Sequence, residues 1–351
     1  MTRLPVAILG ATGTVGQKFI ARLAAHPWFE VVQVAGSPDR IGKRYGDTVR
    51  WREQAPLPER VANLTCTAAE PQGEAVIAFS ALDAAVAREV EPAFAAAGAM
   101  VVSNASAFRM ADDVPLLIPE VNAAHVALLD RQRSERGWRG GIVANPNCST
   151  AALVMALAPL HRAFALERGA IATLQAASGA GYPGVPSLDL LDNVIPFIGG
   201  EEEKIEAEAA KLLGSVGGGT VRPAPFVLAA MVHRVPVVDG HLVSASLAFR
   251  DRPTPEEAIA VLREFRGDDT VAALPSTPAQ PVEVDDRPDR PQSRLDRDRG
   301  DGMTVTVGRV RPCPLHHLRL VALGHNLVRG AAGAAIQNAE LMAVTRGWIM
   351  P

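Results

Sequence analysis

The sequence predicts an α/β protein whose first half contains a parallel, doubly wound sheet. Near the N-terminus an apolar run leads into a glycine-rich turn and then into a helical pattern. Strand-like and helical runs continue to alternate over residues 5–103. This alternation produces parallel strands, because each helix carries the chain back to the same edge of the sheet. The length of 351 residues leaves room for a second domain, at about 150 residues per domain.

The composition is that of an ordinary globular protein, with 48% hydrophobic residues, 21% charged residues and a net charge of −3. We expect no nucleic-acid partner, because there is no basic excess. We expect no membrane association, because no uncharged apolar run approaches about 18 residues. The N-terminus runs directly into a strand pattern, so no signal peptide is expected. The three cysteines are far apart and lack CxxC spacing, which predicts neither disulfides nor a metal site and favours a reducing cytoplasm.

The first motif predicts nucleotide binding. The apolar run Pro5–Leu9 is followed by Gly10, Gly13 and Gly16 and then by a helical pattern over residues 17–25. Glycines at a strand-to-helix turn let the backbone approach a pyrophosphate, which rests on the helix N-terminus. The spacing is G-x-x-G-x-x-G rather than the commoner G-x-G-x-x-G, and a plain strand-to-helix turn is the alternative interpretation.

The end of the next predicted strand, residues 31–35, favours NADP over NAD. An acidic residue at that point would bind the adenosine ribose, and none is present. Instead Ser37, Arg40 and Lys43 follow, and a hydroxyl with two cations suits a 2′-phosphate. A solvated charged loop would look the same, and Asp39 keeps NAD open as the minority interpretation.

Further strands are predicted over residues 75–80 and 100–103, with a helix over 83–97 between them. Arg109 follows the last of these strands. Ligands bind beyond the carboxyl ends of the strands in such sheets, so Arg109 is a candidate for binding an anionic substrate group. On sequence alone a surface arginine is equally consistent.

Cys148 is a candidate nucleophile. It lies between the apolar run of residues 142–144 and a helical pattern that continues to about Phe164. A helix N-terminus stabilises negative charge, which lowers the pKa of a thiol and favours the reactive thiolate. Taken alone, a single cysteine is more often a buried hydrophobe.

Polar residues that follow Cys148 in the chain could complete a site. Gln175 is a buried amide within the apolar strand predicted over residues 170–177, and it is suited to orienting a substrate. The glycine-rich turn that follows, residues 178–184, could bring backbone close to a ligand. Glu201 and Lys204 share one face of a predicted helix, although acids at a helix start are often only solvated.

Arg234 and His241 are the last candidates from residue chemistry. Arg234 can bind a carboxylate through two hydrogen bonds, and His241 can transfer protons near neutral pH. The proline- and charge-rich residues 276–302 are interpreted as a loop or an interface arm. Strands are predicted over 303–310 and 318–323, and a final small-residue helix is expected to return to the nucleotide domain.

Together these motifs resemble aspartate-β-semialdehyde dehydrogenases, in particular the archaeal and fungal branch. The resemblance covers nearly the whole chain and rests on the following segments: Gly10–Gly16, Ser103-Asn-Ala-Ser, Pro146-Asn-Cys-Ser-Thr, Ser178–Gly184, Asn193–Lys204, Arg234 with His241, Arg294-Leu-Asp-Arg, and Gly324-His-Asn326. It implies a Rossmann-type NADP-binding domain over residues 1–146, joined by the C-terminal helix 327–351. It also implies an α+β catalytic and dimerisation domain over residues 147–326.

The resemblance assigns roles by position. Cys148 would be the nucleophile, His241 the general acid/base, and Gln175 the residue that orients the substrate. Four residues would bind substrate: Arg234 at the carboxylate, Glu201 at the amino group (with Glu202 and Glu203 as neighbouring alternatives), and Arg109 and Lys204 at the phosphoryl group or inorganic phosphate. The NADP-binding set would be Gly10, Thr12, Gly13, Thr14, Val15, Ser37, Arg40, Lys43, Ser178, Gly179 and Asn326.

The resemblance also implies a reaction. Cys148 would displace phosphate from L-aspartyl-4-phosphate, and hydride from NADPH would reduce the resulting thioester to L-aspartate 4-semialdehyde. This step belongs to the pathway to lysine, threonine, methionine and isoleucine, and the family implies a homodimer or homotetramer. The alternatives are malonyl-CoA reductase and N-acetyl-glutamyl-phosphate reductase, which share the thioester chemistry, and a non-catalytic NADP-binding sensor. The combination of Cys148, Gln175, Arg234 and His241 argues against a sensor.

Overall fold

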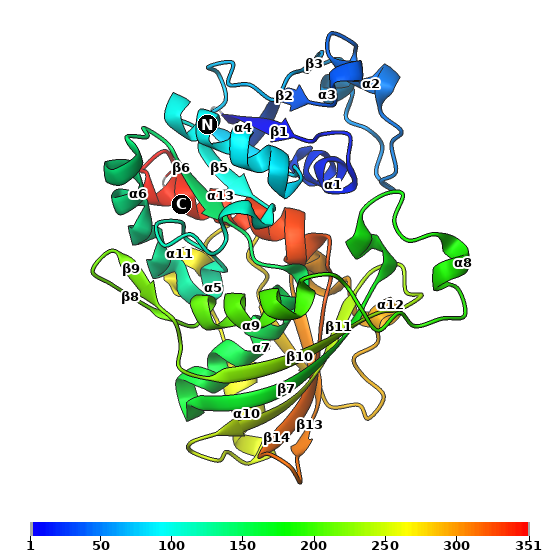
Figure 1. Ribbon diagram of the computed structural model, residues 1–351, viewed down its shortest axis with the longest axis vertical. Coiled ribbons are helices and arrows are strands. Elements are labelled where there is room, and N and C mark those ends of the chain that lie inside the picture. Colours follow the sequence, from blue (N-terminus) through cyan, green and yellow to red (C-terminus); the bar gives the residue numbers. More distant parts are fainter. Residues whose placement is uncertain (1–2, 350–351) are drawn as a thin grey trace.

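The computed structural model of the protein describes residues 3–349 and contains two six-stranded sheets. Figure 1 shows the sheet built from the N-terminal half at the top of the molecule and the second sheet below it. The helix α7 (Cys148–Phe164) connects the last strand of the first sheet to the first strand of the second. Because Cys148 is the first residue of that helix, it lies where the two halves meet.

The first sheet is parallel throughout and has the order β3-β2-β1-β4-β5-β6, which confirms the predicted doubly wound sheet. The helices α1 (Thr14–Leu23) and α4 (Ala84–Ala97) connect parallel strands. The strand order reverses between β1 and β4, and ligands bind beyond such a reversal. The six strands are β1 (Leu4–Leu9), β2 (Phe29–Ala35), β3 (Cys66–Thr67), β4 (Ile77–Ser80), β5 (Met100–Ser103) and β6 (Gly141–Ala144).

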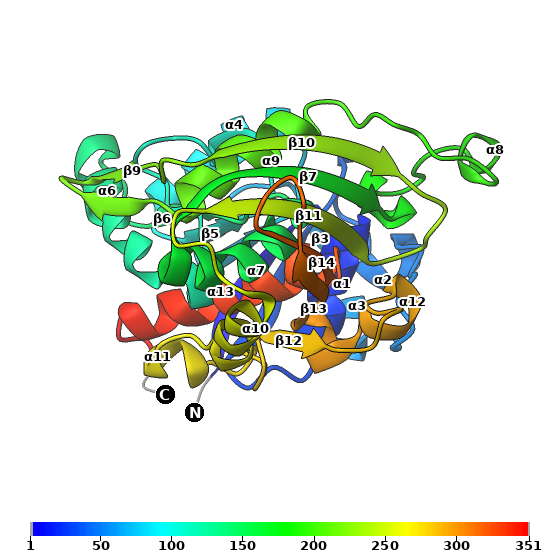
Figure 2. The ribbon, with the colours of Figure 1, turned by 90° about the horizontal axis from the view of Figure 1, so that it is seen from below.

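The second sheet is mixed and has the order β10-β7-β11-β14-β13-β12. The pairs β7–β10 and β12–β13 are parallel, and the other pairs are antiparallel. Figure 2 shows this sheet arching over α7 and α10 (Pro255–Glu264). Its strands are β7 (Leu166–Gln175), β10 (Val227–Arg234), β11 (His241–Phe249), β12 (Val282–Asp285), β13 (Val305–Pro312) and β14 (Leu318–Gly324).

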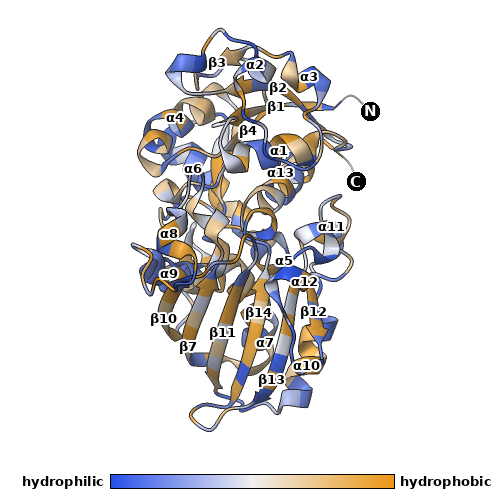
Figure 3. Cartoon of the chain, turned by 90° about the vertical axis from the view of Figure 1, so that its right-hand side faces the viewer, coloured by the Kyte–Doolittle hydropathy of each residue, from blue (hydrophilic) through white to orange (hydrophobic). Residues whose placement is uncertain are grey.

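The core of the second half forms around α7, which is buried from Ser149 to Leu160. This helix packs against β11 and β14, and both α9 (Glu201–Leu212) and α10 pack against it. On the opposite face of the sheet, side chains alternate with the buried ones and remain accessible: Val227 is 70% exposed and Met231 65% exposed. Figure 3 shows this sheet face-on.

Shorter elements connect these layers. They are η1 (Pro38–Arg40), α2 (Tyr45–Thr48), α3 (Glu59–Ala62), η2 (Ser106–Phe108), α5 (Pro119–Asn122), η3 (Ala123–Ala127), α6 (Leu128–Arg136), η4 (Ala177–Ala180), α8 (Ser187–Leu190), the hairpin β8 (Ser215–Gly217) and β9 (Thr220–Arg222), α11 (Asp269–Ala272), α12 (Ser293–Asp296) and η5 (Arg299–Gly302). None of the helices within residues 3–349 combines the length and apolarity that a membrane span needs.

The structure corrects two predictions about the second half. Residues 276–302 are not only a loop or an arm, because β12 pairs in parallel with β13 at the edge of the sheet. Val282 is fully buried, and Arg299 binds Asp285 (2.6 Å) and Asp296 (2.8 Å). Flanking prolines hid this short strand, and an edge strand tolerates them. The strand predicted over residues 170–177 is β7, which begins at Leu166 and ends at Gln175.

The C-terminal segment crosses from the second sheet to the first. One turn of π-helix, η6 (Val328–Ala332), leads into α13 (Gly333–Thr345). The turn η6 packs against α1 and α7, and α13 packs against β4 and β5 of the first sheet. The domain boundaries expected at residues 146 and 326 stay a prediction.

A buried ionic network fixes this crossing segment. Arg329 is 1% exposed and binds both carboxylate oxygens of Glu120, at 2.6 and 3.2 Å. Gln337 accepts a hydrogen bond from Arg329 and donates one to Glu120, and it also donates to Thr277. Each buried charge therefore has a partner, which burial requires.

We predict that Arg329→Met lowers the free energy of unfolding by about 3–5 kcal/mol, because Glu120 would stay buried without its cation. Chemical denaturation followed by circular dichroism measures this change. The matched control is Arg131→Met, which breaks the exposed pair with Glu135 and should cost at most about 1 kcal/mol. Equal losses in the two variants would contradict the role given to this network.

Candidate functional site

One large cleft of about 1240 Å³ brings most of the predicted site residues together. It runs from the glycine turn after β1 to the start of α7 and on to α9 and β10. The predicted site residues that line it are Gly10, Thr12, Gly13, Thr14, Val15, Ser37, Arg109, Cys148, Gln175, Ser178, Gly179, Glu201, Lys204, Arg234 and Asn326. Arg40, Lys43 and His241 do not line it.

The glycine turn has the geometry that a dinucleotide requires. Gly10 has φ +78°, and a Cβ on it would lie 2.7 Å from the carbonyl oxygen of Ala81 at the end of β4. A Cβ on Gly16 would overlap the Gly10 carbonyl. The helix α1 begins after Gly13 without a side-chain cap, so its first N–H groups are available to an anion. The residues present therefore fit a pyrophosphate at this point.

The loop after β2 places only part of the predicted 2′-phosphate set at the cleft. Ser37 lines the cleft, and its hydroxyl lowers the pKa of Asp39 through a hydrogen bond. Arg40 faces Asp39 at 3.9 Å and lies beside Gly36. The NADP-binding roles of Arg40 and Lys43 stay predictions.

Cys148 lies at the start of α7, as its sequence position predicts. The side chain of Asn147 caps this helix by accepting hydrogen bonds from the N–H groups of Ser149 (2.9 Å) and Thr150 (3.2 Å). An asparagine at this position commonly caps a helix. The thiol is half-buried and lines the cleft.

The expected lowering of the Cys148 pKa is not found. Burial, and to a lesser extent the nearby Glu201 carboxylate, raise the pKa of Cys148 to about 12. Arg109, Arg234 and the N–H of Ser149 act in the opposite direction, but desolvation outweighs them. The helix N-terminus is present, yet the site around it keeps the thiol protonated.

The backbone of η6 lies in direct contact with Cys148. A Cβ on Gly330 would lie 2.5 Å from the Cβ of Cys148 and 2.9 Å from its Cα. The neighbouring Ala331 carbonyl accepts a hydrogen bond from Asn145. Only glycine therefore fits at position 330 without displacing the thiol-bearing residue.

Glu201 is the one glutamate of its run that lines the cleft. Glu202 instead accepts a hydrogen bond from the N–H of Val232, and Glu203 is exposed. The Glu201 carboxylate accepts hydrogen bonds from Asn147 Nδ2 at 2.6 Å and from Lys204 Nζ at 2.9 Å. Gln175 Nε2 also points to it, at 3.4 Å. Two predicted substrate residues and the predicted orienting amide thus form one connected cluster.

Arg234 and His241 meet at Ala176. Arg234 donates to the Ala176 carbonyl at 2.7 Å, and His241 Nδ1 accepts the Ala176 N–H at 3.0 Å. The ring is completely buried, and burial, Arg234 and His325 lower its pKa to about 3. A neutral ring whose Nδ1 accepts must carry its hydrogen on Nε2, and that atom has no partner.

The turn after β7 separates His241 from the cleft. A Cβ on Gly179 would lie 2.8 Å from Arg234 Nη1 and 2.9 Å from His241 Cε1, so glycine is required there. Asn326 ties this turn to the start of β11 by donating to Ser178 Oγ and accepting from the N–H of Gly240.

Two buried residues of α9 were not predicted from the sequence. Glu208 is 1% exposed and binds Arg109. Lys211 donates to three backbone carbonyls, those of Arg109, Ala111 and Val114. Their spacing from Glu201 keeps all three on one helix face, and this spacing is the signal that could have found them.

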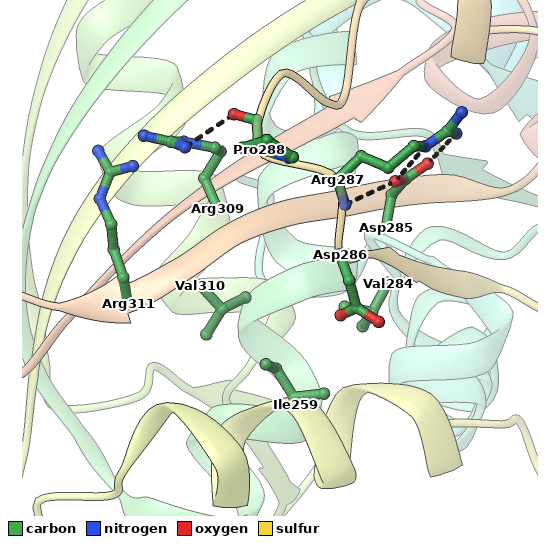
Figure 4. Close-up of a pocket in the computed structure, with 9 residues that line it drawn as sticks. All are labelled: Ile259, Val284, Asp285, Asp286, Arg287, Pro288, Arg309, Val310 and Arg311. Atoms are coloured by element: carbon green, nitrogen blue, oxygen red, sulfur yellow. Dashed lines mark hydrogen bonds and ion pairs between the residues drawn. The ribbon is translucent and has the colours of Figure 1, made fainter.

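A smaller hollow of about 270 Å³ lies between β12, β13 and α10. Figure 4 shows that Arg287 pairs with Asp285, whereas Arg309 and Arg311 extend away from Val310 and Ile259. The carboxylate of Asp285 in this hollow is paired with Arg287. None of the predicted site residues lines the hollow. Within the described part of the chain no cluster of His, Cys, Asp and Glu could hold a metal ion.

Comparison with known proteins gives two family matches and many full-length relatives. Residues 5–129 match the semialdehyde dehydrogenase NAD-binding domain, and residues 157–329 match the semialdehyde dehydrogenase dimerisation domain. The aspartate-semialdehyde dehydrogenase of Archaeoglobus fulgidus is 50% identical, covering 97% of this chain and 98% of its own. The Schizosaccharomyces pombe enzyme is 44% identical, covering 97% and 98%.

Solved structures agree with these matches. The aspartate semialdehyde dehydrogenase of Candida albicans with NADP superimposes with a TM-score of 0.90 at 40% identity, covering 98% of this chain and 99% of its own. The Vibrio cholerae enzyme II has a TM-score of 0.77 at 26% identity, covering 98% and 99%. Archaeal and fungal relatives are among the matches, which confirms the branch predicted from the motifs.

We predict that alkylation of Cys148 by iodoacetamide in the ligand-free protein accelerates about tenfold per pH unit from pH 7 to pH 10 without a plateau. The reason is that only the thiolate reacts and the pKa is raised to about 12. Peptide mass spectrometry measures the rate at each cysteine. Cys313 is the internal control, because hydrogen bonds to its sulfur lower its pKa, so its rate should level off earlier. A plateau for Cys148 below pH 9 would show that the thiolate is already stabilised.

Proposed function

The chain belongs to the aspartate-semialdehyde dehydrogenase family, and we propose that it reduces L-aspartyl-4-phosphate to L-aspartate 4-semialdehyde through a thioester on Cys148. The protein is thus an NADP-dependent oxidoreductase of amino-acid biosynthesis in the aspartate pathway. The observation that supports this reaction best is the single cleft, which joins the dinucleotide turn, a thiol and a cluster of anion-binding and amine-binding side chains.

NADPH would lie along the glycine turn, with its phosphates at the start of α1 and its far end toward Ser178, Gly179 and Asn326, all of which line the cleft. When bound, it supplies the hydride that reduces the acyl group. The chain's part is to place the acyl carbon on Cys148 beside that end of the cleft. Ser37 lies at the opposite end, where a 2′-phosphate would be recognised.

The substrate would be held by opposite charges at its two ends. Arg234 suits the α-carboxylate and Glu201 the amino group, while Arg109 and Lys204 suit the phosphoryl group. Attack of the Cys148 sulfur forms a carbon–sulfur bond and breaks the carbon–oxygen bond to phosphate, and the thiol proton leaves on the phosphate. Phosphate leaves as an anion beside the two cations. Gln175, at the same cluster, would fix the acyl group over the thiol.

The proton-transfer role of His241 requires a rearrangement of the turn above it. In this conformation Nδ1 accepts the Ala176 N–H, so the ring can donate from Nε2 but cannot take up a proton without losing that bond. We propose that ligand binding shifts the Ala177–Ala180 turn, which exposes Nε2 and releases Nδ1. His241 would then protonate the oxygen of the reduced intermediate and recover the proton as the aldehyde forms.

The match to a dimerisation domain makes the protein a homo-oligomer. We propose that the accessible face of the second sheet is the dimer interface, because Leu174, Val227 and Met231 leave an apolar surface there, 39–70% exposed. We also propose a reducing, cytoplasmic location, since all three cysteines are free thiols.

We predict phosphate-dependent reduction of NADP by aspartate semialdehyde, and a loss of about 10³-fold or more in kcat for Cys148→Ala, because Cys148 is the one cysteine among the described residues that line the cleft. NADP binding, measured by calorimetry, should persist in this variant. Malonyl-CoA with NADPH is the comparison substrate. A silent first reaction with an active second one would identify a malonyl-CoA reductase, and normal turnover by Cys148→Ala would exclude covalent catalysis.

For the interface, we predict that Met231→Glu converts the oligomer to smaller species in size-exclusion chromatography with light scattering. Two copies of a buried charge would face each other across a two-fold interface. Ala96→Glu adds the same charge to an exposed position on α4 of the first sheet and should leave the mass unchanged. An unchanged mass for Met231→Glu would place the interface elsewhere.

A further inference from the structure

We propose that Glu208 is a positioning residue that clamps Arg109 to the backbone beside the nucleophile and so fixes where the phosphoryl group lies relative to Cys148. This inference rests on the proposed function, in which Arg109 binds the phosphoryl group. It concerns a residue that touches neither the substrate nor the thiol. Glu208 acts through the two groups that it holds.

Both oxygens of the Glu208 carboxylate are used. Oε1 accepts from Arg109 Nη1 at 3.0 Å, and Oε2 accepts from the backbone N–H of Asn147 at 2.6 Å. Arg109 belongs to the loop after β5, whereas Asn147 directly precedes Cys148. One buried carboxylate therefore joins the anion-binding arginine to the start of the nucleophile's helix.

The clamp leaves Arg109 able to bind an anion. Its Nη2 donates to the carbonyl of Asn104 at 2.7 Å, and its Nε is buried without a partner. An arginine has five N–H donors, and the protein uses two of them here. One N–H on each terminal nitrogen is engaged. The second N–H on each is left for an anion in the cleft, which Arg109 lines.

A second residue of α9 holds the backbone of the same arginine. Lys211, 5% exposed, donates to the carbonyl of Arg109 at 2.7 Å and to those of Ala111 and Val114. The helix α9 thus fixes the main chain of Arg109 through Lys211 and its guanidinium through Glu208. The same helix presents Glu201 and Lys204 to the cleft, so the anion site and the amine site share one rigid support.

Only a carboxylate can make both contacts of Glu208. Two donors converge on its two oxygens, and a glutamine would place an NH₂ group against one of them. In Glu208→Gln we therefore expect Arg109 or Asn147 to lose its partner. The KM for phosphate in the oxidative reaction should rise about tenfold or more, because an arginine that is not held binds its anion less well. The KM for NADP should change less than about twofold.

The experiment is steady-state kinetics of the full-length protein with NADP, aspartate semialdehyde and varied inorganic phosphate. Glu206→Gln is the matched control, since Glu206 lies on α9 but accepts a hydrogen bond from the N–H of Ala230, away from the cleft. The decisive comparison is a double-mutant cycle with Arg109→Leu. If Glu208 acts through Arg109, Glu208→Gln should have little further effect on the phosphate KM once Arg109 is gone.

Glu208→Asp serves if the glutamine variant does not fold, because the shorter side chain keeps its charge but reaches only one donor. A rise in phosphate KM in either variant that disappears in the Arg109→Leu background supports the proposal. An unchanged phosphate KM, or an equal rise in the presence and absence of Arg109, overturns it while the proposed function stands. Absence of phosphate-dependent turnover in the unmodified protein would overturn the proposed function and this inference with it.

Discussion

The residue before the nucleophile, Asn147, holds the two halves of the site together. Its side-chain oxygen caps α7, its side-chain nitrogen donates to Glu201, and its backbone N–H donates to Glu208. Each of these groups is buried, so each contact must be made for the cleft to form at all. The position of Cys148 follows from this one residue, because a capped helix fixes where its first residue lies. The position of the anion site also depends on Asn147, because Glu208 binds both the N–H of Asn147 and the guanidinium of Arg109.

Most of the charged side chains around the thiol are paired with one another. Glu201 and Glu208 are paired with Lys204 and Arg109. Arg109 and Arg234 favour the thiolate of Cys148, but burial outweighs them and keeps the thiol protonated. A substrate that brings its own anion and ammonium group would compete for these partners. The carboxylate of Glu201 would turn to the substrate's amine, and its effect on the thiol would fall. On this view the thiolate forms when substrate is present, which limits reaction with other electrophiles.

The sequence predicted the fold class, the parallel sheet of the first half and strands in both halves, because glycine turns and apolar periodicity are local signals. The strand β12 was missed, since four residues between prolines carry too little periodicity. Among the site residues, those at the ends of strands or helices were found. Glu208 and Lys211 were not, because mid-helix charges normally face solvent and only the packing of α9 against the loop after β5 buries them. The position of His241 beneath the Gly179 turn, and its low pKa, depend on contacts with Gly179, Arg234 and His325, which are distant in the sequence or on other elements.

Glycines from distant segments lie directly against the two reactive side chains. Gly330 lies against Cys148 and Gly179 against His241, each closer than any side chain would permit. Backbone in direct contact with a side chain leaves it little freedom, and π-helical turns such as η6 are frequent at functional sites because they redirect backbone locally. The turn η6 is also joined to α13, whose Gln337 shares the buried pair of Arg329 with Glu120. A movement of the first sheet relative to the second would therefore displace Gly330 and, through it, Cys148. The geometry of the nucleophile thus depends on how the two sheets are joined as well as on its own helix.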